Sequence, residues 1–131
     1  MSTTKLDKKS FQRAVEDGKT LIVDFWASWC GPCMSFAPVF DEASKKHEDI
    51  IFGKVNTEEE QELAGGLGIR SIPTLMVFRE QVLLFNQAGS LSPSQLEELI
   101  TQIKALDMTK VHSEIAEEQK KKADEQPAQS T

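Results

Sequence analysis

Two cysteines, separated by two residues, are the side chains best suited to chemistry in this chain of 131 residues. Cys30 and Cys33 are its only cysteines, and they follow the apolar run from Ile22 to Trp26. Residues three apart on a helix are neighbours, with Cβ atoms about 5–6 Å apart, so a small shift of the chain can close a disulfide between them. A bond that closes so short a loop adds little stability, and the spacing therefore favours redox cycling.

Cys30 is expected to lie at the start of a helix, and this position gives the two thiols different roles. Free N–H groups and the helix macrodipole favour a thiolate there, so Cys30 is the candidate nucleophile. Cys33, one turn deeper, would attack the mixed disulfide that Cys30 forms. Gly31 leaves room for a substrate backbone, and Pro32 suits the first positions of a helix. This dipeptide holds no base that would stabilise a thiolate strongly, which favours a reductant.

Two other interpretations of the cysteine pair are an inert buried pair and half of a zinc site. A structural zinc site needs about four ligands, and only His47 and His112 could complete one. We therefore predict no metal. The first residues lack the apolar segment of a secretory signal, so we expect a cytoplasmic location. In that reducing compartment a Cys-X-X-Cys pair is catalytic or metal-binding more often than structural.

The composition argues against two classes of partner. The net charge of -6 disfavours nucleic acid and anionic membrane surfaces, because phosphate binding needs a basic face. No apolar stretch approaches the roughly 20 residues of a transmembrane helix. Hydrophobic residues make up 39% of the chain, enough for one core.

Helices and buried strands are expected to alternate along the chain and to position the cysteines. Short apolar runs predict strands, and apolar residues three and four apart predict helices. Strand–helix–strand units followed by a hairpin predict an α/β domain whose mixed sheet lies between helices. Ser92 and Gln95 form a capping box at the start of the last core helix. The expected elements are helix 7–17, strand 20–27, helix 30–47, strand 50–56, helix 58–66, strands 74–79 and 82–87, and a helix from 93 to about 106.

Asp24 is the second candidate for chemistry, because a carboxylate inside an apolar strand is costly unless it is paired or protonated. Burial would raise its pKa and allow it to accept the Cys33 proton. The alternative is a structural aspartate whose charge is satisfied by a partner. Lys54, in the next strand, is its expected neighbour, although a lysine there could also be a solvated edge charge. Trp29, next to Cys30, is expected to form a partly exposed contact surface, whereas Trp26 is expected to pack in the core.

Four segments together resemble the thioredoxin family, and the similarity extends from about Leu6 to Leu106. A Cys-X-X-Cys pair alone would be weak support, but the pentad together with an upstream buried aspartate and a downstream Ile-Pro-Thr is specific. The segments are Val23-Asp24-Phe25-Trp26-Ala27-Ser28-Trp29-Cys30-Gly31-Pro32-Cys33, Phe36-Ala37-Pro38, Gly68-Ile69-Arg70-Ser71-Ile72-Pro73-Thr74 and Gly89.

The resemblance implies a thioredoxin fold and a role for each of these residues. Cys30 matches the family's nucleophile, Cys33 its resolving thiol, Asp24 its buried acid and Lys54 the lysine beside that acid. It also implies a cis peptide bond before Pro73, although an X–Pro bond is cis in only about 5–6% of cases. The implied substrate groove comprises Trp29, Gly31, Pro32, Ile72, Pro73, Thr74 and Gly89.

The sequence departs from the family pattern at three places. Met34 stands where many members carry a basic residue, and Glu80-Gln81 replaces a turn that usually contains glycine. The third departure is the segment after Leu106, which is longer than in a minimal member of the family. We therefore expect residues 1–106 to form the thioredoxin domain and residues 107–131 to form a charged extension. For this extension, a disordered, solvated segment is favoured over a short amphipathic helix.

These features predict a general protein-disulfide reductase that works by dithiol–disulfide exchange through Cys30 and Cys33. The resemblance implies protein substrates with disulfides, no bound cofactor, a monomer, and recharging by thioredoxin reductase with NADPH. Two alternatives are a thioredoxin-like redox protein with one dedicated partner, and a thioredoxin-fold binding or scaffold module whose thiols are incidental.

Overall fold

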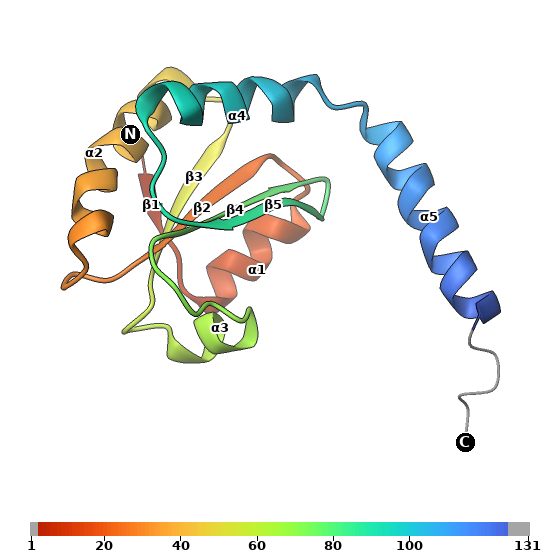
Figure 1. Cartoon of the computed structure of the whole chain (residues 1–131), viewed down its shortest axis with the longest axis horizontal. Helices are drawn as coiled ribbons and strands as arrows, with labels where there is room; N and C mark the ends of the chain where they lie inside the picture. The colour runs from red at the N-terminus through yellow and green to blue at the C-terminus, as the bar shows by residue number, and fades with distance from the viewer. Residues whose placement is uncertain (1–2, 126–131) are drawn as a thin grey trace. The chain divides into compact units, whose positions relative to one another are not determined.

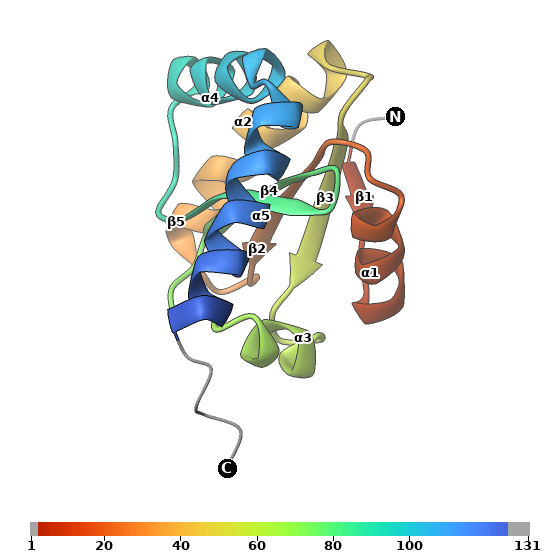
Figure 2. The same ribbon diagram turned by 90° about the vertical axis from the view of Figure 1, so that its right-hand side faces the viewer.

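A sheet of five strands in the order β1-β3-β2-β4-β5 positions the cysteine pair, as the computed structural model shows for the described residues 3–125. Strands β1, β2 and β3 run parallel to one another. Strand β4 pairs antiparallel with β2, and β5 pairs antiparallel with β4. Figures 1 and 2 show this mixed sheet in two views. The strands are β1 (Thr3–Lys5), β2 (Leu21–Trp26), β3 (Ile51–Asn56), β4 (Thr74–Arg79) and β5 (Val82–Ala88).

Helices cover both faces of the sheet (Figure 1). On one face the ring of Phe40 in α2 (Gly31–Lys46) lies 5.2 Å from that of Phe52 in β3. On the other, the ring of Phe11 in α1 (Lys8–Glu16) lies 5.5 Å from that of Phe78 in β4. The predicted mixed α/β architecture is thus confirmed. The helices are α1 (Lys8–Glu16), α2 (Gly31–Lys46), α3 (Gln61–Gly66) and α4 (Pro93–Ala105).

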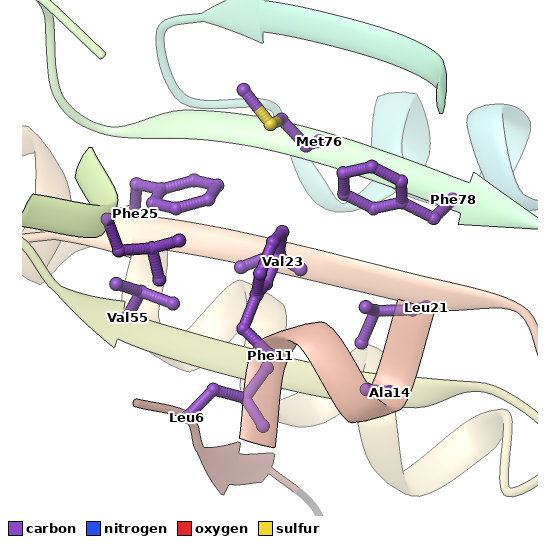
Figure 3. Packing of buried hydrophobic residues seen from close by; sticks show 10 residues of the cluster. Leu6, Phe11, Ala14, Leu21, Val23, Phe25, Val55, Met76 and Phe78 are labelled. Atoms are coloured by element: carbon purple, nitrogen blue, oxygen red, sulfur yellow. The ribbon is translucent and has the colours of Figure 1, made fainter. Parts of the chain in front are cut away.

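Side chains alternate between the two faces along β2. Val23 and Phe25 point to the α1 side, where Phe11 and Met76 complete a closed apolar cluster (Figure 3). Asp24, between Val23 and Phe25, therefore points to the side that α2 covers. The fully buried members of the α1 cluster include Leu21, Val23, Phe25 and Val55.

Short polar sequences decide how two of the helices begin. The Asp7 carboxylate accepts the Ser10 backbone N–H at 2.8 Å, and the Ser10 hydroxyl accepts the Asp7 N–H, so a capping box starts α1. The capping box that the sequence predicts before α4 is confirmed. Ser92 N–H donates to Gln95 Oε1 at 2.9 Å, and Gln95 N–H donates to Ser92 Oγ at 3.2 Å.

Strand β1 is a feature that the sequence interpretation missed. Its three residues pair in parallel with β3, with Thr4 opposite Gly53. Thr4 and Lys5 are exposed at the sheet edge, so this strand has no apolar pattern that would distinguish it from a loop. It is held by the β3 backbone, and only the structure reveals that pairing.

The turn between β4 and β5 consists of Glu80 and Gln81, which have positive φ values of 51° and 69°. Two successive positive φ values suit a tight hairpin, although Asn-Gly is the usual sequence there. The turn is held from outside: Glu80 N–H donates to the Gly18 carbonyl at 2.8 Å, and Gln81 Nε2 donates to the Glu16 carbonyl at 2.9 Å.

The chain divides into two compact units, residues 1–100 and 101–131, and α4 runs through the boundary. In the second unit the helix α5 (Met108–Glu125) begins after Asp107, whose side chain accepts the Lys110 N–H at 3.3 Å. The expectation of disorder is wrong for these 18 residues. Lys, Glu, Gln and Ala all have favourable helix propensity, so a composition unable to build a core can still form a helix. Residues 126–131 lie outside the described part.

Candidate active site

The two cysteines form a disulfide at the N-terminus of α2. Their Cα atoms are 5.2 Å apart, within the usual range for a disulfide. Cys33 is 1% exposed and Cys30 is 5% exposed, so the outer sulfur is only marginally more accessible in this oxidised form. Ala27, Trp26 and Ile72 pack around the pair. The strand β2 and the loop after it therefore deliver both sulfurs to one buried spot.

Cys30 is itself the N-cap of α2. Its extended backbone (φ -90°, ψ 111°) precedes the first turn, and its Sγ accepts the Cys33 N–H at 3.2 Å. Pro32 is placed within the first helical positions, where its missing N–H costs nothing. A Cβ added at Gly31 would meet nothing within 4 Å, so the backbone here is open on its outer side. The helix terminus thus directs a backbone N–H at a sulfur that gains negative charge on reduction.

The loop before β4 forms the facing wall of the site. The Ile72–Pro73 peptide bond is cis, as the family resemblance implies and contrary to the generic preference for trans. The Ile72 carbonyl oxygen lies 3.7 Å from Cys30 Sγ. Gly89 N–H donates to the Pro73 carbonyl at 2.8 Å, which brings Gly89 beside this wall. The Thr74 hydroxyl donates to the Ser71 carbonyl, so its side chain is engaged within the loop.

Asp24 is fully buried in the middle of the sheet. Neither of its carboxyl oxygens has a hydrogen-bond partner among the residues that the structure describes. Burial raises the pKa of Asp24 to about 7, and the positive charge of Lys54 opposes that rise. The carboxyl group can therefore gain or lose a proton near neutral pH, as a general acid or base requires.

Lys54 lies directly opposite Asp24 in the parallel pairing of β2 and β3. Its ammonium group sits 4.9 Å from the centroid of the Trp26 ring, in a cation–π arrangement. Trp26 is only partly exposed and also packs against the disulfide cluster. From the sequence, Trp26 was expected to flank the cysteine pair and to pack in the core. Its position two residues after Asp24 places it on the same face of the strand as that carboxyl group.

Two large apolar side chains next to the disulfide face solvent. Trp29 is 69% exposed and Met34 is 43% exposed. Within residues 3–125, the other exposed large apolar side chains are Leu83 and Leu106. Exposed aromatic surface beside a reactive group provides a contact area for a partner. The side chains around the sulfurs carry no charge from Trp29 to Phe36.

Within residues 3–125 no group of three or more His, Cys, Asp and Glu side chains could hold a metal ion. In the same residues, no helix combines the length and apolar character needed to cross a bilayer. The chemistry that the site itself offers is exchange at two sulfurs with a nearby carboxyl group of raised pKa.

Comparison with known proteins gives one consistent result. The family model named Thioredoxin matches residues 2–105. A Streptomyces coelicolor protein assigned as thioredoxin 2 is 48% identical over 118 residues, which cover 90% of this chain and 88% of that protein. A thioredoxin of Buchnera aphidicola is 39% identical over 98 residues, covering 73% of this chain and 91% of the relative.

Solved structures agree with these sequence matches. A mutant thioredoxin from Halobacterium salinarum superposes with a TM-score of 0.74 at 26% identity, covering 81% of this chain and 94% of that one. Chloroplastic thioredoxin z gives the same TM-score at 27% identity, covering 81% of this chain and 97% of its own.

Proposed function

Because this chain belongs to the thioredoxin family and is a thiol–disulfide oxidoreductase that reduces protein disulfides, we propose that Cys30 attacks the substrate and Cys33 completes the reaction. Support comes from the position of Cys30 at the helix N-cap, where its sulfur accepts a backbone N–H. The same geometry stabilises a thiolate once the disulfide is reduced.

The proposed reaction consists of two exchanges at sulfur. In the first, the Cys30 thiolate attacks one sulfur of a substrate disulfide, forms a mixed disulfide and releases the other substrate sulfur as a thiolate. In the second, Cys33 loses its proton and attacks Cys30 Sγ, which forms the Cys30–Cys33 disulfide and releases the second substrate sulfur. The substrate gains two electrons and takes up two protons, and the protein is left oxidised.

Asp24 is the proposed acceptor of the Cys33 proton. Support comes from its complete burial, its lack of hydrogen-bond partners within residues 3–125 and a pKa raised to about 7. Lys54, opposite Asp24, moderates that pKa through its positive charge. A carboxyl group of this kind can hold a proton near neutral pH and return it to a leaving thiolate.

We propose that a substrate segment lies across the exposed surface at the helix N-terminus. Open space above Gly31, the exposed ring of Trp29 and the proximity of Gly89 to Pro73 support this position. An extended segment there would pass Cys30 and could meet the backbone of the Ile72 loop. The proposed contact surface consists of Trp29, Gly31, Pro32, Ile72, Pro73, Thr74 and Gly89.

The wider setting of the reaction follows from the family. We propose that thioredoxin reductase, with NADPH as electron donor, returns the Cys30–Cys33 disulfide to two thiols, and that the protein acts as a monomer in the cytoplasm. Residues 1–106 are the proposed redox domain and 107–131 an extension outside the chemistry. A chain that ends at Leu106 should then reduce a small disulfide within about twofold of the full chain, because the proposed exchange uses no residue beyond Gly89.

Reduction of insulin disulfides by the pre-reduced protein tests the roles of the two cysteines. Cys30→Ser should abolish turnover, because no nucleophile remains for the first exchange. Cys33→Ser should also abolish turnover but should accumulate mixed disulfides, which mass spectrometry detects as adducts on Cys30. Turnover by Cys30→Ser at the wild-type rate, or adducts formed on Cys33 in place of Cys30, would contradict the proposal. One trapped protein in a cell extract would indicate a dedicated partner, and many would indicate a general reductase.

A further inference from the structure

The side chains of Asp24, Trp26 and Lys54 lie on the α2 side of the sheet, opposite the apolar cluster on the α1 side. Asp24 and Trp26 are two apart on β2 and therefore point the same way. Lys54 of β3 lies in register with Asp24, so all three side chains emerge on one face next to one another. Trp26 also touches the cluster that contains both cysteines. Trp26 therefore links the cluster that contains the disulfide with the lysine.

Lys54 has a long, flexible side chain and two possible neighbours for its ammonium group. The structure places that group 4.9 Å from the centroid of the Trp26 ring. Neither oxygen of the adjacent Asp24 accepts a hydrogen bond from Lys54 or from any other described residue. Lys54 is partly exposed, whereas Asp24 is fully buried. An ammonium group at the ring keeps part of its hydration, which it would lose in a buried ion pair with the carboxylate.

We propose that Trp26 is a positioning residue whose ring holds the Lys54 ammonium group and so keeps the buried Asp24 carboxyl group free of an ion-pair partner. The energies are compatible with this role. A cation–π contact is favourable even where the cation stays partly hydrated. Burying both ions of a pair removes their hydration, and their mutual attraction offsets that loss only in part. A contact of modest strength at the ring can therefore decide where the ammonium group stays.

The functional meaning of this arrangement rests on the proposed role of Asp24 as proton acceptor. An aspartate paired directly with a lysine is held in its ionised form and becomes a weak base. An aspartate without such a partner keeps the raised pKa that buried carboxyl groups have. Trp26 would thus act on proton transfer through Lys54, without touching the proton itself.

Few other charges can influence Asp24 from the elements packed around it. On β4 its partner in register is Leu75, and the preceding residue on its own face of β2 is Ile22. Cys33 is the one titratable residue among the buried side chains of α2, and it carries no charge in the disulfide. The buried side chains of α4 are apolar. Lys54 is accordingly the charge that acts on the Asp24 pKa, which it lowers.

The test measures the pKa of Asp24 in the oxidised protein by NMR of its side-chain carboxyl carbon, so that no thiol titrates. Trp26→Leu removes the ring and should lower the pKa of Asp24 by on the order of one unit, because Lys54 can then pair with the carboxylate. Trp26→Phe keeps an aromatic face, so it should lower the pKa of Asp24 by less than half as much as Trp26→Leu does. In a Lys54→Met background, Trp26→Leu should leave the pKa of Asp24 nearly unchanged.

This double-mutant comparison separates positioning from simple packing. Loss of the indole could also admit water to Asp24 and lower its pKa by hydration. That effect would persist without Lys54, so an equal drop in the Lys54→Met background would overturn the proposal. An unchanged or higher pKa of Asp24 in Trp26→Leu would overturn it as well.

A measurement on the unaltered protein covers the case in which Trp26→Leu does not fold. The ε-methylene protons of Lys54 should be shifted upfield by the ring current of Trp26, relative to the other lysines. Shifts equal to those of an unstructured lysine would contradict the proposal. None of these readouts uses turnover. A failure here therefore leaves the roles of Cys30 and Cys33 intact, and a failure of the insulin test leaves the Trp26–Lys54 contact intact.

Discussion

The two faces of β2 carry different kinds of side chain, although they alternate along one strand. Val23 and Phe25 point into a closed apolar cluster on the α1 side. Asp24 and Trp26 point to the α2 side. There a buried carboxyl group without hydrogen-bond partners among the described residues lies next to Lys54, and Trp26 packs against the cluster that contains the disulfide. The first face lowers the free energy of the fold, whereas the second carries a polar group that raises it.

This contrast shows how a small domain can support a costly site. The cost of burying Asp24 falls on a strand in which the residues before and after it, Val23 and Phe25, are fully buried. Substitutions on the two faces should therefore change stability in opposite directions.

Phe25→Ala should destabilise the protein most. The ring is fully buried and meets the Phe11 ring edge-on at a centroid distance of 6.4 Å. Truncation should cost about 3–5 kcal/mol of unfolding free energy through lost burial and a residual cavity. Denaturant titration measures this loss, and the reduction rate per folded molecule should stay near that of the wild type. A loss below about 1 kcal/mol, smaller than such truncations cost, would contradict the assignment of this face to stability.

Asp24→Asn should act in the opposite direction and should depend on pH. The pKa of Asp24 rises from 3.8 to about 7 on folding, so stability from this group is complete below pH 4 and is lost as the pH rises towards 7. The difference of about three units corresponds to about 4 kcal/mol above pH 7. Asparagine cannot ionise, so at pH 8 the variant should be more stable by roughly 2–4 kcal/mol.

The stability of Asp24→Asn and of the wild type should converge near pH 4, where both side chains are neutral. The same variant should slow the second exchange at sulfur, because the proposed proton acceptor is lost. Equal stability of the two proteins at pH 8 would show that the carboxyl group is not buried as an unpaired charge. A matched substitution on a solvated carboxylate, Glu48→Gln, should leave stability within about 0.5 kcal/mol at both pH values.

The smallest expected effects come from alanine substitutions at two glycines, one with a buried side chain against it and one with open space beside it. A Cβ added at Gly53 would come within 2.3 Å of the buried Leu6 side chain, so Gly53→Ala should cost about 1–3 kcal/mol by overpacking. A Cβ at Gly31 meets nothing within 4 Å, so Gly31→Ala should change stability by less than about 0.5 kcal/mol. Gly31→Ala should nevertheless lower kcat/KM for protein disulfides. Normal kinetics in this variant would weaken the proposed contact surface.

The order of the main elements could be read from the sequence, because apolar runs and caps are local signals. The capping box at Ser92 and the hairpin of β4 and β5 are examples. β1 could not be found, since Thr3-Thr4-Lys5 becomes a strand only through β3. The helix α5 was misjudged because a polar composition was taken to favour disorder over helix propensity.

Within the site, the sequence identified which residues could react but not how they are oriented. Asp24 was recognisable as a charge in an apolar run, and the pairing of β2 with β3 places Lys54 opposite it. Whether the Lys54 ammonium group lies at the carboxylate or at the Trp26 ring depends on side-chain torsions and hydration. The spacing of residues in the sequence carries no information on either. The cis peptide bond before Pro73 could be predicted only from the family resemblance, because local preferences favour the trans form.

The wall formed by Ile72 reaches Cys30 from 42 residues further along the chain. During synthesis, both cysteines therefore leave the ribosome well before the segment around Ile72 that lies against Cys30 in the folded protein. Contacts of such long range form late, after the costly closure of the intervening loop. A half-synthesised chain would carry a pair of ordinary exposed thiols with no shaped surroundings. Any advantage of the folded site over an ordinary pair of thiols should consequently emerge only when β4 pairs with β2 and brings Ile72 to Cys30.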